Sequence, residues 1–64
     1  MYRIIVELNN QTPEVVAEFW DPHDALIFAE TERTLLEHER YSGAIVIASQ
    51  NERIARLAVN GVLQ

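Results

Sequence analysis

The chain contains no cysteine and no lysine, and it has only two glycines among its 64 residues. Without cysteine, it cannot form disulfide bonds, thiolate metal sites or a CxxC redox centre. Without lysine, the P-loop and Schiff-base chemistry are excluded. The two glycines stand apart at positions 43 and 61, so the sequence has no glycine-rich loop to hold a phosphate group.

Long hydrophobic runs are absent as well. No apolar segment approaches the roughly 18 residues that span a bilayer. The N-terminal segment is too short to resemble a signal peptide, and Glu7 interrupts it. We expect a whole cytoplasmic chain that begins inside its first strand and makes no membrane contact. With 64 residues, the chain is expected to form a single domain, residues 1–64.

The charge is acidic and uneven along the chain. Ten acidic residues stand against five arginines, for a net charge of -5. Residues 21–40 hold six acids and two arginines, a balance of -4, and the other residues hold four acids and three arginines, a balance of -1. Affinity for phosphate backbones comes mainly from clustered lysine and arginine. We therefore expect no direct binding to nucleic acid.

Two strands are predicted in the first third of the chain. Residues 2–8 are rich in β-branched side chains, with one face formed by Tyr2, Ile4, Val6 and Leu8. Residues 9–13 interrupt the pattern with asparagine and proline, which favour a turn. Residues 14–20 form the second strand, with Val15, Ala17 and Phe19 on one face and Val16, Glu18 and Trp20 on the other. A hairpin is the simplest connection.

A helix is predicted from Pro22 to about Arg40. Asp21 can accept hydrogen bonds from the first turn, and proline suits the first helical position because no N–H is needed there. Gly43 or a residue near it is expected to end the helix in a left-handed conformation. Arg33 and Glu37, four residues apart, are expected to form a modest surface ion pair.

The last third of the chain has one clear strand and one ambiguous segment. Residues 43–49 are apolar enough to lie in the centre of a sheet. Ser49 and Glu52 have the spacing of a capping box, so a short helix ending at Asn60-Gly61 is one reading of the last segment. The other reading makes residues 50–51 a hairpin turn and residues 53–59 a fourth strand. We favour the strand because it completes a four-stranded sheet.

The predicted fold is therefore α+β, ββαββ, with a four-stranded, mainly antiparallel sheet in the order 2-1-3-4 and the helix on one face. The alternative is ββαβα. The helix residues expected nearest the sheet are Ala25, Phe28, Ala29, Leu35 and Leu36. The opposite sheet face is expected to show Ile5, Val16, Trp20, Val46 and Ile54 among charged side chains.

Five consecutive apolar residues, 25–29, lie near the start of the predicted helix. A helix turns by about 100° per residue, so five consecutive side chains cannot all face one sheet. Leu26 and Ile27 lie on opposite flanks, and at least one of them is expected outside the core. A small chain without disulfides gains stability most readily by association. The pattern therefore predicts a homodimer or another oligomer.

No set of catalytic or metal-binding residues is apparent. His23 and His38 stand 15 positions apart on the predicted helix, about 22 Å at 1.5 Å per residue, so they cannot share a ligand within one chain. Neither has the helical spacing of a metal site. Ser42 and Ser49 lie at predicted element ends without a neighbouring base. We expect no cofactor, no metal ion and no enzymatic activity.

Three functions remain open from the sequence. The first is a small homo-oligomeric module that binds another protein through surplus apolar surface. The second is an acidic inhibitor or decoy of a nucleic-acid-binding enzyme, of the kind found in phages and plasmids, because acids recur seven residues apart at Glu30/Glu37 and Glu32/Glu39. The third is a small-ligand or enzyme site formed across a dimer interface. The residues predicted for interaction are Ile5, Val16, Trp20, Leu26, Ile27, Glu30, Glu37 and Val46.

Overall fold

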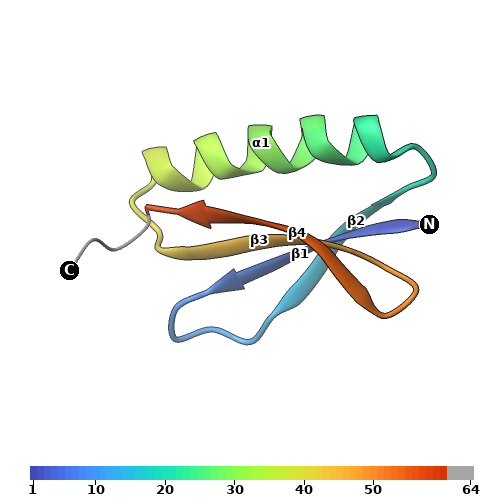
Figure 1. Cartoon of the computed structure of the whole chain (residues 1–64). Helices are drawn as coiled ribbons and strands as arrows, with labels where there is room; N and C mark the ends of the chain where they lie inside the picture. The colour runs from blue at the N-terminus through green and yellow to red at the C-terminus, as the bar shows by residue number, and fades with distance from the viewer. Residues whose placement is uncertain (61–64) are drawn as a thin grey trace.

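The computed structural model describes residues 1–60 and contains four strands and one helix (Figure 1). The elements are β1 (Tyr2–Leu8), β2 (Glu14–Phe19), α1 (Pro22–His38), β3 (Gly43–Ser49) and β4 (Glu52–Val59). The strands form one open sheet in the order β2-β1-β3-β4, and each neighbouring pair is antiparallel. The α+β, ββαββ fold and the strand order predicted from the sequence are confirmed.

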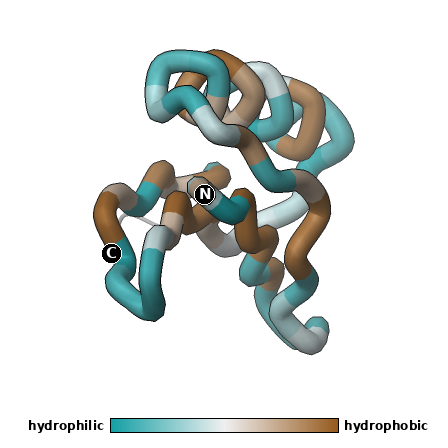
Figure 2. Tube along the Cα trace, turned by 90° about the vertical axis from the view of Figure 1, so that its right-hand side faces the viewer, coloured by the Kyte–Doolittle hydropathy of each residue, from teal (hydrophilic) through white to brown (hydrophobic). Residues whose placement is uncertain are grey.

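The helix forms a second layer on one face of the sheet (Figures 1 and 2). Because β2 and β3 both pair antiparallel with β1, they run in the same direction, and α1 makes the crossover between them. Ala25 and Ala29 are fully buried where the helix meets the sheet, while Phe28 and Leu36 pack beside them. Two alanines at this contact allow a close approach of helix and sheet.

Strand β3 is the centre of the core. Its residues from Ala44 to Ala48 are all buried, whereas the edge strands β2 and β4 are largely exposed. Ile45 and Ile47 join Ile4 and Val59 in the cluster that faces the helix. A strand that is buried on both faces is continuously apolar, and this is the pattern of the predicted central strand.

The helix begins as the sequence predicts and ends slightly earlier. The Oδ1 atom of Asp21 accepts a hydrogen bond from the backbone N–H of His23 at 2.8 Å, and Pro22 takes the first helical position. The helix ends at His38, not at Arg40. The left-handed residue that follows the helix is Arg40, with a φ of 69°, so the helix is ended by a residue near Gly43 and not by Gly43 itself.

Gly43 has a different role at the start of β3. Its φ is 152°, and a Cβ atom at this position would overlap the carbonyl oxygen of Glu7 and lie 2.7 Å from Cα of Leu8. The backbones of β1 and β3 therefore approach each other here more closely than any larger residue permits. The pairing continues beyond the strand ends, because Asn9 donates its N–H to the carbonyl of Ser42 at 2.8 Å.

Each edge strand contains an irregularity that the sequence did not predict. In β2 the pairing moves from Ala17 to Val15 and skips Val16, and in β4 it moves from Ala55 to Arg53 and skips Ile54. Such bulges insert one extra residue and change which face the next residue occupies. Val15 therefore lies opposite Ile5 and is 50% exposed, so its predicted place on the core face with Ala17 is wrong.

The final segment is a strand, as favoured above, and the capping-box alternative is wrong. Gln50 and Asn51 both have positive φ and form the turn between β3 and β4. Ala55, Leu57 and Val59 face the core as predicted. Gly61, the proposed end of the alternative helix, lies outside the described residues. No helix in residues 1–60 has the length and apolar character needed to cross a membrane.

Replacing Asp21 with alanine is expected to lower the free energy of unfolding by about 1 kcal/mol, because the first turn of α1 loses its side-chain acceptor. The measurement is urea denaturation followed by circular dichroism. Asp21→Ser, which keeps an acceptor oxygen, is the matched control and should retain most of the stability. Equal midpoints for the alanine and serine variants would contradict the capping role.

Replacing Gly43 with alanine is expected to lower the free energy of unfolding by about 3 kcal/mol or more, because the added methyl group meets the β1 backbone at a positive φ. Thermal and urea denaturation both report this loss. Ser42→Ala is the neighbouring control, since the hydrogen bond of Ser42 to Asn9 uses only its backbone carbonyl. A stable Gly43→Ala variant would mean that β1 and β3 can move apart here.

Candidate interaction surface

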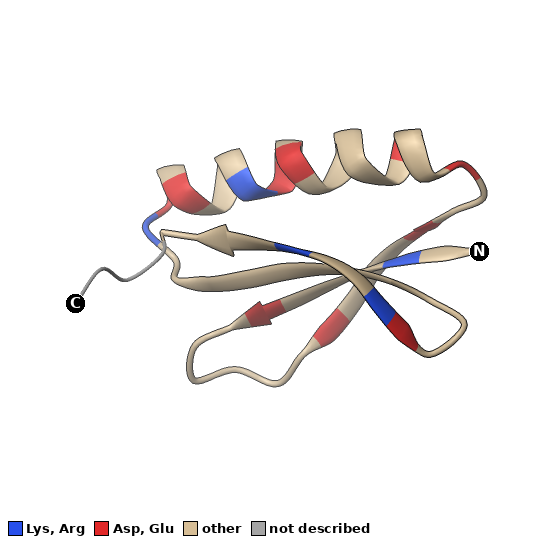
Figure 3. Cartoon of the chain, viewed as in Figure 1, with Lys and Arg blue, Asp and Glu red and all other residues tan. Residues whose placement is uncertain are grey.

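The sheet face turned away from α1, called the open face below, carries charged and small side chains. The strand registers place on it Arg3, Ile5 and Glu7 from β1, Ala44, Val46 and Ala48 from β3, and Arg56 and Ala58 from β4. Three of the five arginines of the chain, Arg3, Arg53 and Arg56, lie on β1 and β4 (Figure 3). The open face is therefore less acidic than the helix.

Two ion pairs cross the open face. Arg53 Nη2 lies 2.8 Å from Glu7 Oε1, and this pair joins β4 to β1 across β3. Arg3 Nε lies 3.2 Å from Glu18 Oε2 and joins β1 to β2. Ion pairs this exposed add little stability.

Val46 has no exposed surface in the single chain, although it points away from the helix. Its cross-strand neighbours are Ile5 on β1 and Arg56 on β4, and Ile5 is half-buried. The expectation that Val46 shows on this face is therefore wrong. The apolar side chains that remain accessible to another molecule on this side of the sheet are Ile5 and, at the bulge of β2, Val15 and Val16.

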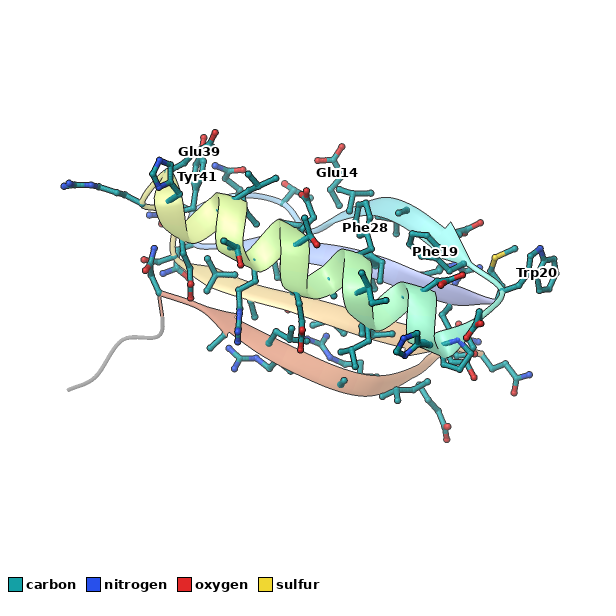
Figure 4. All side chains as sticks on the ribbon, turned by 90° about the horizontal axis from the view of Figure 1, so that it is seen from above. Glu14, Phe19, Trp20, Phe28, Glu39 and Tyr41 are labelled. Carbon is teal, nitrogen blue, oxygen red and sulfur yellow. The ribbon has the colours of Figure 1, made fainter. Side chains whose placement is uncertain are left out.

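Trp20 lies just beyond the last residue of β2, so it does not continue the face of that strand. Its side chain projects from one end of the sheet (Figure 4), and it is 80% exposed. It does not pack under the start of the helix. The pairing of Tyr2 with Phe19 brings Met1, itself 42% exposed, to the same end of the sheet. We call this pair, Trp20 and Met1, the tryptophan end.

The structure separates the predicted interaction residues into three groups. Ile5, Val16 and the covered Val46 belong to the open face and the bulge of β2. Trp20 stands apart from them at the tryptophan end. Leu26, Ile27, Glu30 and Glu37 are on α1.

Leu26 and Ile27 are 41% and 52% exposed, so both lie outside the core. Phe28 packs on Phe19 of β2, with ring centroids 5.3 Å apart (Figure 4). At about 100° per residue, Leu26 is on the other flank of the helix, toward β4, and Ile27 points away from the sheet. The five-residue apolar run is thus divided between core and surface as predicted.

The acidic side chains of α1 do not form a single face. Glu37 lies on the flank near β4, where its carboxylate accepts the backbone N–H of Asn60 at 3.2 Å. Glu32 is half-buried on the sheet side, and Glu39 follows the helix as its C-terminal cap. Arg33 and Glu37 are not among the ion pairs of residues 1–60, so the predicted pair is wrong. Glu37 binds Asn60 instead.

No set of catalytic side chains lies close together among the described residues. His23 and His38 lie at opposite ends of α1. The hydroxyls of Thr31 and Thr34 donate to helix carbonyls four residues earlier, so each bonds to backbone and not to a base. Within residues 1–60, no three histidine, aspartate or glutamate side chains gather closely enough to hold a metal ion.

Sequence reasoning missed several exposed apolar residues. Val15 is exposed because of the bulge in β2, and no pattern in the sequence marks its position. Ile54, expected on the surface, is exposed at the bulge of β4. Leu35 was expected against the sheet and is 53% exposed. Its helical angle relative to Ala25 and Ala29 gives the signal, because it places Leu35 on the flank beyond Phe28. The position of Met1 at the same end of the sheet as Trp20 follows from the pairing of Tyr2 with Phe19.

Comparisons of the chain with protein-family models, with curated proteins and with solved structures found no match.

Replacing Trp20 with alanine is expected to change the free energy of unfolding by less than about 0.5 kcal/mol, because the indole makes few contacts within the chain. Phe19→Ala, one residue earlier, should lower it by about 2 kcal/mol or more, because Phe19 packs against Phe28. Urea denaturation followed by circular dichroism measures both. A large loss for the Trp20 variant would show that the indole stabilises the fold.

Proposed function

We propose that the chain is a small, non-catalytic interaction module that associates with itself and binds another protein through the tryptophan end. The observation that carries this proposal is the 80% exposure of Trp20, the only tryptophan of the chain. Tryptophan is strongly enriched among the few residues that dominate binding energy at protein interfaces. Methionine at the same end of the sheet supplies an adaptable apolar contact.

The wider distribution of apolar surface supports association. Nine large hydrophobic side chains within residues 1–60 are at least 40% exposed: Met1, Val15, Val16, Trp20, Leu26, Ile27, Leu35, Tyr41 and Ile54. Single exposed apolar residues are ordinary, but this number on so small a chain leaves much surface that a partner would remove from water. A domain of about 60 residues also has a core too small to be very stable alone.

The acidic decoy remains a weaker proposal. A decoy needs fixed negative charges on one surface to match a basic groove. Glu30 and Glu37 lie on the flank of α1 toward β4, whereas Glu32 is half-buried on the sheet side and Glu39 follows the helix as its cap. The carboxylate of Glu37 is also held by Asn60. An enzyme site across a dimer has no specific observation in its favour.

Two measurements test the proposed function. Sedimentation velocity across a concentration series is expected to give a homodimer at micromolar concentration, and a monomer throughout would overturn self-association. For the second protein, immobilised wild type is compared with Trp20→Ala in native cell extract. Retention that is lost in Trp20→Ala and survives high salt supports apolar docking at the tryptophan end.

Leu35→Ala is the matched control, since it removes an exposed apolar side chain from a different surface. It should retain the same partner. Equal retention by wild type, Trp20→Ala and Leu35→Ala would contradict docking at the tryptophan end. Retention that disappears at high salt would instead favour the acidic decoy, because exposed charge contacts are screened.

A further inference from the structure

We infer that two copies of the chain join edge to edge through β4, so that their sheets form one continuous eight-stranded sheet. This inference rests on the proposed self-association and specifies its surface. The sheet is open, and its two outer strands, β2 and β4, each present a row of backbone N–H and C=O groups without a neighbouring strand in residues 1–60. Such edges pair readily with other strands unless the sequence prevents it.

The β2 edge is poorly suited to pairing with a second copy. It is six residues long, Pro13 stands directly before it, and a bulge at Val16 interrupts it. If the β2 strands of two copies paired antiparallel about a two-fold axis at Val16, Glu14 of one copy would lie opposite Glu18 of the other. Like charges placed directly opposite each other destabilise a strand pair. Proline, a bulge and charge are the devices that protect sheet edges.

The β4 edge lacks most of these obstacles. It is eight residues long, contains no proline and runs regularly from Ala55 to Val59 beyond its bulge. If the β4 strands of two copies pair antiparallel about a two-fold axis at Leu57, Leu57 of one copy lies opposite Leu57 of the other. Ala55 then lies opposite Val59, and Arg56 lies opposite Ala58. In this register, the two residues of each pair lie on the same side of the combined sheet, because their sequence numbers differ by an even number and side chains alternate along a strand. Apolar side chains then meet on the helix side, and no two charges of one sign lie directly opposite.

The helix flank above β4 agrees with this arrangement. Asn60 follows β4 directly and bonds to Glu37, so this flank lies on the β4 side. Leu26, Glu30 and Arg33 share the flank at helical spacing. In a dimer joined at β4, this flank of one copy faces the same flank of the other.

Ala58 offers the sharpest test, because it is exposed on the open face and lies opposite the partner's Arg56 in the proposed register. Directly opposite residues have Cβ atoms about 4.5–5.5 Å apart. Ala58→Lys places like charges together at two symmetric positions and should weaken the dimer roughly tenfold at low salt. Ala58→Glu places opposite charges together and should strengthen it by a similar factor. Both effects should shrink in high salt.

The experiment is sedimentation equilibrium of the full chain, with circular dichroism to verify that each variant folds. Opposite shifts of the dimer constant for the two Ala58 variants support the β4 seam. A wild-type dimer that neither variant shifts, but that Val16→Asp dissociates, overturns the β4 seam and leaves self-association intact. A wild type that is monomeric at every concentration overturns both.

Amide hydrogen exchange gives an independent measurement on the unmodified protein. Concentrating the wild type from its monomeric to its dimeric range should slow exchange in β4, where outward N–H groups gain partners. Exchange in β2 should not change. Slower exchange confined to β2 would contradict the proposed seam.

Discussion

The burial of β3 on both faces is the constraint on which the rest of the structure depends. Toward the helix, Ile45 and Ile47 form the floor on which α1 packs. On the other side, Val46 also has no exposed surface, and its cross-strand neighbours are Ile5 and Arg56. The pairing of β3 with β1 requires Gly43, since only a glycine permits the close approach to the β1 backbone there. Among the strands of residues 1–60, only β3 has all its interior positions buried.

The two faces of β3 are covered by different means. The helix covers one face with alanine and phenylalanine, which exclude water by close packing. The open face receives no element of the described chain, and arginine side chains on it pair with glutamates on other strands. These pairs are exposed, so their charge contributes little to stability. Long arginine side chains can cover apolar surface with their methylene groups, which is compatible with an apolar central strand beneath this face.

The elements could be predicted from the sequence because their signals are local. Asp21-Pro22 marks the helix start, and the unbroken apolar run of residues 43–49 marks the central strand. The bulges could not be predicted, since they depend on how β1 and β3 set the register of their neighbours. A shift of one residue moves a side chain to the other face, which is why Val15 left the predicted core. Trp20 is exposed because β2 stops one residue before it.

The same limit applies to the interaction surface. Sequence periodicity predicted that at least one of Leu26 and Ile27 lies outside the core, and both do, since the angles around a helix are fixed by its geometry. It grouped Trp20 with Val46, because alternation assumes that a strand continues. The structure shows one of these side chains covered and the other projecting from the end of the sheet. The face that a side chain occupies within a regular helix or strand could be predicted from the sequence. The positions at which a strand ends or contains a bulge could not.

The exposed aliphatic residues follow from the size of the chain. Each edge strand holds one extra residue, Val16 in β2 and Ile54 in β4, and both are among the exposed hydrophobic side chains. In a larger domain, a further strand or helix would cover such positions. Here the single helix already covers the helix-side face of the sheet. Cover by a second molecule, as proposed above, would remove this surface from water, and the free energy gained would add to folding stability through mass action.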